Sequence, residues 1–281
     1  MRRALELRRA LGIPRESPAN AFDVCHAVGM ELRFMDLPSL EGMFSQDPHP
    51  IVILPSFEHR PKGRVLFSCG HEVGHYQLGH KPTVDKVLAS SNKPSSKPDD
   101  EIQADAFASS LLMTRQAINS CFSNMQLDVK TAEEFGFYSV SRQLGVGYTT
   151  LLMHCRYGLE MISASQFGQL RKIAPKTIRA QFLDERSINS DIVFVDDSWP
   201  NVPVELEVGD FVFLPPGTPL GEAAFSLIRE ISSDENWMRF QAISQGQLGF
   251  DMNGKSISIR IASKNYCGLF KFRYLEDPDE E

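Results

Sequence analysis

The spacing of apolar residues divides the first part of the chain into short helices and a few strands. Two helices are expected on either side of a turn at residues 13–18, because apolar residues recur there at intervals of three or four. Strand-like runs follow at 31–35 and 51–54, and Gly42 to Phe44 is a candidate edge strand between them. Helical spacing then returns in two longer segments, 63–80 and 100–121.

The rest of the chain changes character twice. Residues 81–100 lose periodicity, and the Ser- and Pro-rich run 90–98 predicts an exposed loop. Further short helices are expected over 130–162. After about Lys176, short apolar runs alternate with Gly, Pro, Asn and Asp turns, which is typical of β-structure. The six candidate strands are 192–195, 211–214, 225–228, 238–243, 257–261 and 269–274.

Together these patterns predict an α+β protein in three parts. We expect an N-terminal domain with a small sheet over residues 1–125 and a helical segment over 126–180. A mostly-β domain over 185–281 would form a small sandwich or open barrel, with the boundary between 175 and 190. The acidic end, 276–281, is expected to fray.

Composition limits the classes of function and the compartment. The 281 residues carry 29 basic and 36 acidic side chains, a formal charge of -7, so contact with nucleic acid would have to use a local patch. The chain has no run of about 18 apolar residues and no apolar segment after its basic start, so neither a membrane span nor secretion is expected. Five scattered cysteines suit a reducing, cytoplasmic setting.

The sharpest chemical signal is His71-Glu72-Val73-Gly74-His75, an H-E-x-x-H pattern inside a predicted helix. Four residues advance an α-helix about 40° beyond one turn, so both imidazoles project from one face and can share a tetrahedral zinc ion. Glu72 stands beside the first histidine, where its carboxylate can take a proton from the attacking water and later pass it to the departing amine.

Two histidines do not complete a catalytic zinc site, and Glu101 is the third ligand that we favour. Glu101 and Asp105 lie four residues apart on the next predicted helix and therefore on the same face. If Glu101 binds zinc, Asp105 is placed to accept the outer N–H of one of the histidines, which would fix its tautomer. His80 is the competing ligand, but on a continuous helix it would lie about 140° round from His75.

These residues resemble the ImmA/IrrE-type metallopeptidases, a gluzincin-like family. The likeness runs from Arg64 through His80 and resumes at Glu101 through Met113, and it covers roughly residues 1–165. Two departures leave the metal residues unchanged: Thr114 stands where the family usually has proline, and Ser68-Cys69-Gly70 replaces a small apolar lead-in.

The resemblance implies a zincin-like domain with one zinc ion on His71, His75 and Glu101 and with Glu72 as the general base. It also implies a substrate strand beside Gly42–Phe44, held by main-chain pairing. The implied substrate is a helix-turn-helix transcriptional repressor, cut under stress or phage attack, with DNA as a possible activating ligand. Tyr76 is near enough in sequence to act as a donor to the oxyanion, although the sequence does not aim it.

Two further interpretations stay open. Residues 133–162 read as helix, Gly-containing turn and helix, which fits a helix-turn-helix, but only Arg142, Arg156 and His154 supply charge for DNA contact. The N-terminal arginines, Arg2, Arg3, Arg8 and Arg9, form a better electrostatic patch. The alternative to a peptidase is a non-catalytic, zinc-containing regulatory protein that acts through its helix-turn-helix-like and β-rich parts.

Overall fold

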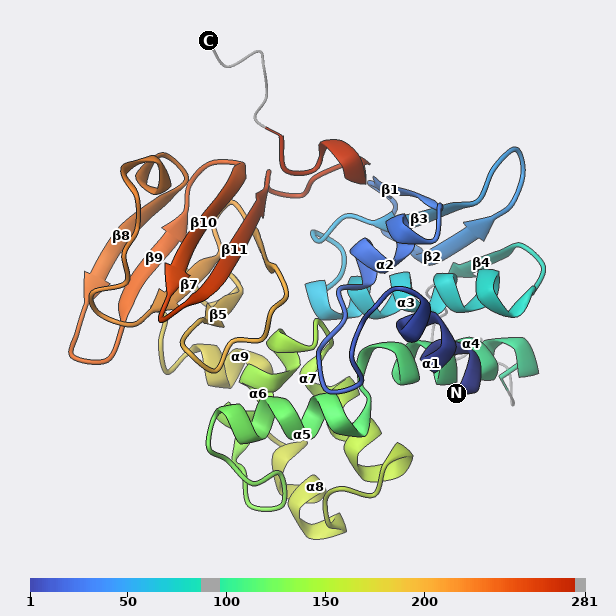
Figure 1. Ribbon diagram of the computed structural model, residues 1–281, viewed down its shortest axis with the longest axis horizontal. Coiled ribbons are helices and arrows are strands. Elements are labelled where there is room, and N and C mark those ends of the chain that lie inside the picture. The colour runs from blue at the N-terminus through green and yellow to red at the C-terminus, as the bar shows by residue number, and fades with distance from the viewer. Residues whose placement is uncertain (87–96, 276–281) are drawn as a thin grey trace. The chain divides into compact units, whose positions relative to one another are not determined.

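The computed structural model describes residues 1–86 and 97–275 (Figure 1). The loop expected over 90–98 falls largely outside these residues, and so does the acidic end. The contacts group the chain into two units, and the sequence-based boundaries at 125 and at 180–185 stay a prediction. The first unit comprises Met1–Ile118, Leu144–Leu151 and Asn265–Phe270, and the second comprises Asn119–Gln143, Leu152–Lys264 and Lys271–Glu281.

The first unit is built on a mixed five-stranded sheet in the order β12-β1-β3-β2-β4. β1 and β3 run parallel, with Arg33 opposite Ile53, and the other pairs are antiparallel. Its helices are α1 (Arg2–Ala10), α2 (Ala21–Ala27), α3 (Lys62–Leu78) and α4 (Asp99–Leu112), and its strands are β1 (Glu31–Met35), β2 (Leu40–Ser45), β3 (Ile51–Pro55), β4 (Thr83–Lys86) and β12 (Gly268–Leu269).

The expected edge strand at Gly42–Phe44 is a strand, but it is not at an edge. Residues 83–86 return after α3 and pair antiparallel with β2, so that Met43 lies opposite both Ile53 and Val84. This four-residue strand is too short to show an apolar alternation of its own. Among the described residues, the outer strand on this side of the sheet is therefore β4.

The last predicted strand, 269–274, was assigned to the wrong sheet. Only Gly268 and Leu269 are extended, and they pair with β1 of the first unit, after which the chain forms a short 3-10 helix at Phe270–Phe272. The ring of Phe270 packs against Phe22, with 5.7 Å between the centroids. A segment near the end of the chain thus completes the N-terminal sheet.

One N-terminal arginine is not part of an exposed patch. Arg8 is 1% exposed and donates to the carbonyl oxygens of Leu111, Pro14 and Ser17. Burial lowers the pKa of its guanidinium to about 10. The side chain therefore ties α1 to the end of α4 and to the following loop, which a helical-wheel reading of the arginine cluster does not reveal.

The predicted helix 100–121 is two helices. α4 ends at Leu112, and Thr114 Oγ1 accepts the backbone N–H of Ala117 at 3.0 Å, which is the bond of an N-cap residue. The next helices are α5 (Arg115–Asn124), α6 (Glu134–Gln143), α7 (Tyr148–Met153), α8 (Ala164–Leu170) and α9 (Pro175–Arg179), with a π-helical turn at His154–Gly158 after α7. α6 and α7 occupy the predicted helix-turn-helix, whose role stays a prediction.

The β-rich part of the second unit consists of two sheets around one apolar core, as the sequence predicted. One sheet has the order β10-β11-β6 and the other β5-β7-β9-β8. Val212, Phe240, Leu248 and Ile259, from strands of both sheets, belong to one buried cluster. The strands are β5 (Ile192–Phe194), β6 (Val204–Glu207), β7 (Phe211–Leu214), β8 (Ile228–Ser233), β9 (Met238–Ala242), β10 (Gly246–Met252) and β11 (Lys255–Ala262).

No helix in the described part of the chain is both long and apolar enough to span a membrane.

Candidate metal centre

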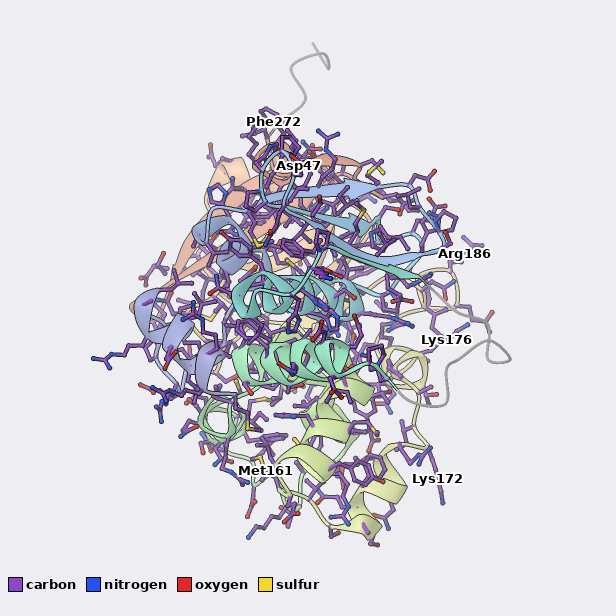
Figure 2. The ribbon with its side chains drawn as sticks, turned by 90° about the vertical axis from the view of Figure 1, so that its right-hand side faces the viewer. Asp47, Met161, Lys172, Lys176, Arg186 and Phe272 are labelled. Atoms are coloured by element: carbon purple, nitrogen blue, oxygen red, sulfur yellow. The ribbon has the colours of Figure 1, made fainter. Side chains whose placement is uncertain are left out.

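The candidate site lies between two helices of the first unit that pack side by side, α3 and α4 (Figures 1 and 2). Their close approach depends on Gly74, because a Cβ there would lie 3.2 Å from the carbonyl oxygen of Ala104 and 3.2 Å from the side chain of Phe107. Glu101 lies in the first turn of α4 with Asp99 and Asp100, where the positive end of the helix dipole favours carboxylates.

Two histidines and one glutamate converge at this point. His71 and His75 are 4% and 0% exposed, and their Nε2 atoms lie 2.9 Å apart. Glu101 reaches both, with 3.3 Å from its Oε2 to Nε2 of His71 and 3.4 Å from its Oε1 to Nε2 of His75. Within the described residues, these three form the group that could hold a metal ion, with one donor atom from each lying within 4.8 Å of the others.

This donor set fits zinc. Tetrahedral bonds of about 2.0–2.1 Å place neighbouring ligand atoms about 3.3 Å apart. Each histidine nitrogen lies at about this distance from one of the two carboxylate oxygens of Glu101, at 3.3 Å for His71 and 3.4 Å for His75. The two histidine nitrogens would have to separate by a few tenths of an ångström. Each of the three side chains offers a lone pair, and imidazole with carboxylate is a common zinc ligand set.

The outer nitrogen of each histidine has a partner of its own. Nδ1 of His71 lies 2.9 Å from Oδ1 of Asp105, and Nδ1 of His75 lies 3.0 Å from Nδ1 of His80. Asp105 in turn receives a hydrogen bond from Lys97 at 2.5 Å through its second oxygen. Burial alone would raise the pKa of Asp105, but the contacts with His71 and Lys97 lower it below its usual value.

Glu72 lies under β2, and its side chain is fully buried. The main chain at Gly42 runs so close to it that a Cβ at this position would overlap Oε1 of Glu72 and lie 3.1 Å from its Cδ. The carboxylate is therefore confined between its own helix and the sheet strand above it.

The other residues considered from the sequence lie elsewhere. Tyr76 packs its ring on Phe44 at 5.8 Å between centroids, and its role as a donor to the oxyanion stays a prediction. His59 contacts Asp36, and His49 lies 3.7 Å from Glu31. The sequence analysis did not predict the role of Lys97 or the contact between His80 and His75. For His80, the helix-ending Gly79 was the one signal in the sequence that the chain turns at this point.

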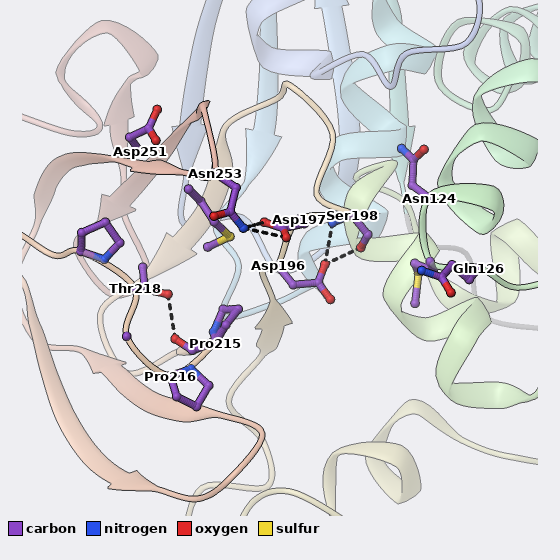
Figure 3. Close-up of a pocket in the computed structure, with 14 residues that line it drawn as sticks. Asn124, Gln126, Asp196, Asp197, Ser198, Pro215, Pro216, Thr218, Asp251 and Asn253 are labelled. Atoms are coloured by element: carbon purple, nitrogen blue, oxygen red, sulfur yellow. Dashed lines mark hydrogen bonds between the residues drawn. The ribbon is translucent and has the colours of Figure 1, made fainter.

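The second unit contains a cavity of about 600 Å³ with an acidic lining (Figure 3). Its carboxylates already have polar neighbours: Asp196 accepts from Ser198, and Asp197 accepts from Asn253 at 2.8 Å. Among the described residues, the carboxylates of this cavity do not form a group that could hold a metal ion, unlike His71, His75 and Glu101 on α3 and α4.

Residues 25–153 match the model of the IrrE N-terminal-like domain, a peptidase family. This segment contains α3, α4 and all the residues of the candidate metal centre. A search of curated proteins gave no match.

Proposed function

Residues 25–153 belong to the ImmA/IrrE-type metallopeptidase family, and from this premise we propose that the chain is a zinc-dependent endopeptidase of the gluzincin-like kind. One observation carries the proposal. The lone-pair donors of His71, His75 and Glu101 lie within 4.8 Å of one another between α3 and α4, and Glu72, next to His71 in the chain, is buried.

Each residue has a definite task in this proposal. His71, His75 and Glu101 would hold one zinc ion, which when bound would supply Lewis-acid activation of water and of the peptide carbonyl. Glu72 accepts the proton of the attacking water and returns it to the amine that leaves. Asp105 holds the ring of His71 by accepting from its Nδ1.

The substrate is proposed to be an extended peptide that pairs with the sheet, because main-chain pairing fixes a scissile bond without demanding much sequence. In the described residues the outer strand is β4, so we propose pairing there rather than with β2. The family resemblance favours a helix-turn-helix transcriptional repressor as substrate, cut in the cytoplasm on a stress or phage signal. The proposal that DNA is the activating signal rests on the same resemblance. Arg142 of the helix-turn-helix-like segment gives DNA binding little support, since its charge is paired with Asp191 at 2.7 Å.

The metal is tested first. Mass spectrometry of the native protein is expected to find one zinc ion per chain, and His75→Ala is expected to abolish it. The matched control is His49→Ala, since His49 is half-exposed and lies away from the cluster. A protein without zinc, or with zinc that survives His75→Ala, would contradict the proposed centre.

The base is tested next. The Glu72→Gln protein should keep its zinc and lose cleavage of a panel of helix-turn-helix repressors, assayed with and without single-stranded DNA. Loss of a general base lowers such a rate by about 10²–10⁴-fold. The exposed Glu6→Gln is the control. Bound zinc together with no cleavage by the parent protein would favour the non-catalytic, regulatory alternative.

A further inference from the structure

His80 faces the metal centre from the outer side of His75. The two rings lie 5.0 Å apart between centroids at 69°, and their Nδ1 atoms are 3.0 Å apart. The side chain of His80 is only 8% exposed, so water competes little for this contact. The other ring nitrogen, Nε2, lies 3.7 Å from Oδ1 of Asp100 at the start of α4.

The end of α3 builds this contact. Gly79 adopts the left-handed conformation (φ 72°, ψ 28°). The N–H of Gly79 then bonds the carbonyl of Tyr76, and the N–H of His80 bonds the carbonyl of His75 at 3.0 Å. This pair of bonds is the Schellman motif, which turns the chain back across the last helical turn. His80 is thus off the helix, and the 140° separation of a continuous helix does not apply to it.

Hydrogen-bond chemistry fixes the roles of the two rings. The Nε2 atom of His75 belongs to the donor cluster, so a neutral ring that offers its Nε2 lone pair carries its proton on Nδ1. That N–H can donate only to a lone pair, and Nδ1 of His80 lies within hydrogen-bond distance of it at 3.0 Å. His80 then carries its own proton on Nε2, on the side of Asp100.

We propose that His80 is a positioning residue of the metal centre: it accepts the Nδ1–H of His75 and so fixes the tautomer and the ring orientation with which His75 binds the ion. The inference rests on the proposed zinc site and deepens it. The two histidine ligands then have different supports, since His71 bonds a carboxylate and His75 bonds a neutral ring. Partners of this kind typically contribute 10–100-fold to metal affinity.

Two substitutions at this position separate hydrogen bonding from packing. His80→Leu fills the space and removes the acceptor. His80→Asn places an amide oxygen about where Nδ1 stands and keeps an acceptor. We expect His80→Leu to weaken zinc binding by about 10–100-fold and His80→Asn to stay within about 3-fold of the parent. Chelator competition measures the affinity, and the visible spectrum of the cobalt-substituted protein reports the ligand geometry.

The outcomes are distinguishable from a failure of the proposed function. If the parent protein binds no zinc, the metal centre itself is wrong. If the parent binds zinc, the inference is overturned when both variants lose affinity equally, which marks a packing role, or when neither does. Unfolding of the metal-free proteins is measured alongside, and His49→Asn serves as a control at an exposed histidine.

Discussion

Buried polar side chains are arranged differently in the two units. In the first, His71, His75 and Glu101 direct lone pairs at one common point. In the second, Tyr138, Arg142 and Asp191 bond one another: Arg142 donates to Asp191 at 2.7 Å, and the hydroxyl of Tyr138 donates to its other oxygen at 3.0 Å. His71, His75 and Glu101 offer lone pairs that could bind a cation. In the second unit, by contrast, the donors of Tyr138 and Arg142 bond the carboxylate of Asp191.

This difference separates a binding site from a structural link better than burial does. Burial by itself would lower the pKa of Arg142, but the adjacent Asp191 raises it above its usual value. Burial and the same carboxylate raise the pKa of Tyr138. Shifted pKa values thus accompany side chains that bond a common carboxylate within the protein. What marks the first unit is that its donors share a target.

The largest effect is expected where the sheet touches the candidate base. In Gly42→Ala the new Cβ overlaps Oε1 of Glu72, so the buried carboxylate of the proposed base must shift from its present position. We expect cleavage to fall by about 10²–10⁴-fold, the contribution of a general base, while zinc affinity changes little. Cleavage kinetics and zinc titration measure the two quantities.

A helical glycine in the second unit is the control for this substitution. A Cβ at Gly168 meets no atom within 4 Å, so Gly168→Ala should leave cleavage unchanged. If Gly42→Ala cleaves as fast as the parent, the position of Glu72 beneath β2 is irrelevant to the reaction.

The next effect is on stability and belongs to the second unit. Asp191→Asn leaves the guanidinium of Arg142 without its carboxylate, and we expect the free energy of unfolding to fall by about 3 kcal/mol. This is the low end for a buried pair, because both side chains keep some exposure. Urea denaturation measures the change, with the exposed Asp234→Asn as the control. Zinc affinity should stay that of the parent.

The rate of cysteine labelling shows which unit loses stability in Asp191→Asn. Cys121 and Cys155 are buried in the second unit, and Cys25 and Cys69 are buried in the first. Burial raises the pKa of Cys121 to about 12, so it reacts only when the structure opens. In Asp191→Asn we expect faster labelling of Cys121 and Cys155 alone. A parallel rise at all four cysteines would mean that the ion pair supports both units.

The regular parts of the fold were predictable from the sequence, and several irregular ones were not. The spacing of apolar residues identified α3, β1 and β3. It placed a strand at 225–228, where the chain instead forms a 3-10 helix at Glu222–Ser226 before β8 begins. It also missed β10, whose alternate positions are occupied by Gly and polar residues, although the Asn253-Gly254 turn that joins it to β11 was a hairpin signal.

The candidate site shows the same limit. His71 with His75, and Glu101 with Asp105, could be paired from helical spacing because each pair lies four residues apart on a regular helix. The contact of His80 could not, because one left-handed residue redirects the chain after Leu78. The contacts of Lys97 with Asp105 and Glu101 depend on how the chain enters α4, and no periodicity describes this.

The smallest effect is expected from a comparison of two helix ends within the first unit. α2 and α3 both end in the Schellman pattern, with Gly29 (φ 80°) and Gly79 (φ 72°) in the left-handed conformation, and a Cβ at either meets no atom within 4 Å. Replacing either glycine by alanine should therefore cost a similar amount, about 1 kcal/mol of backbone strain. Only Gly79 sets the position of His80, so Gly79→Ala alone should weaken zinc binding, by a few-fold, as the strained turn shifts that ring from His75. Thermal unfolding and chelator competition on both variants separate the two quantities. An equal loss of zinc affinity in Gly29→Ala would show that general destabilisation, and not the placement of His80, controls the metal.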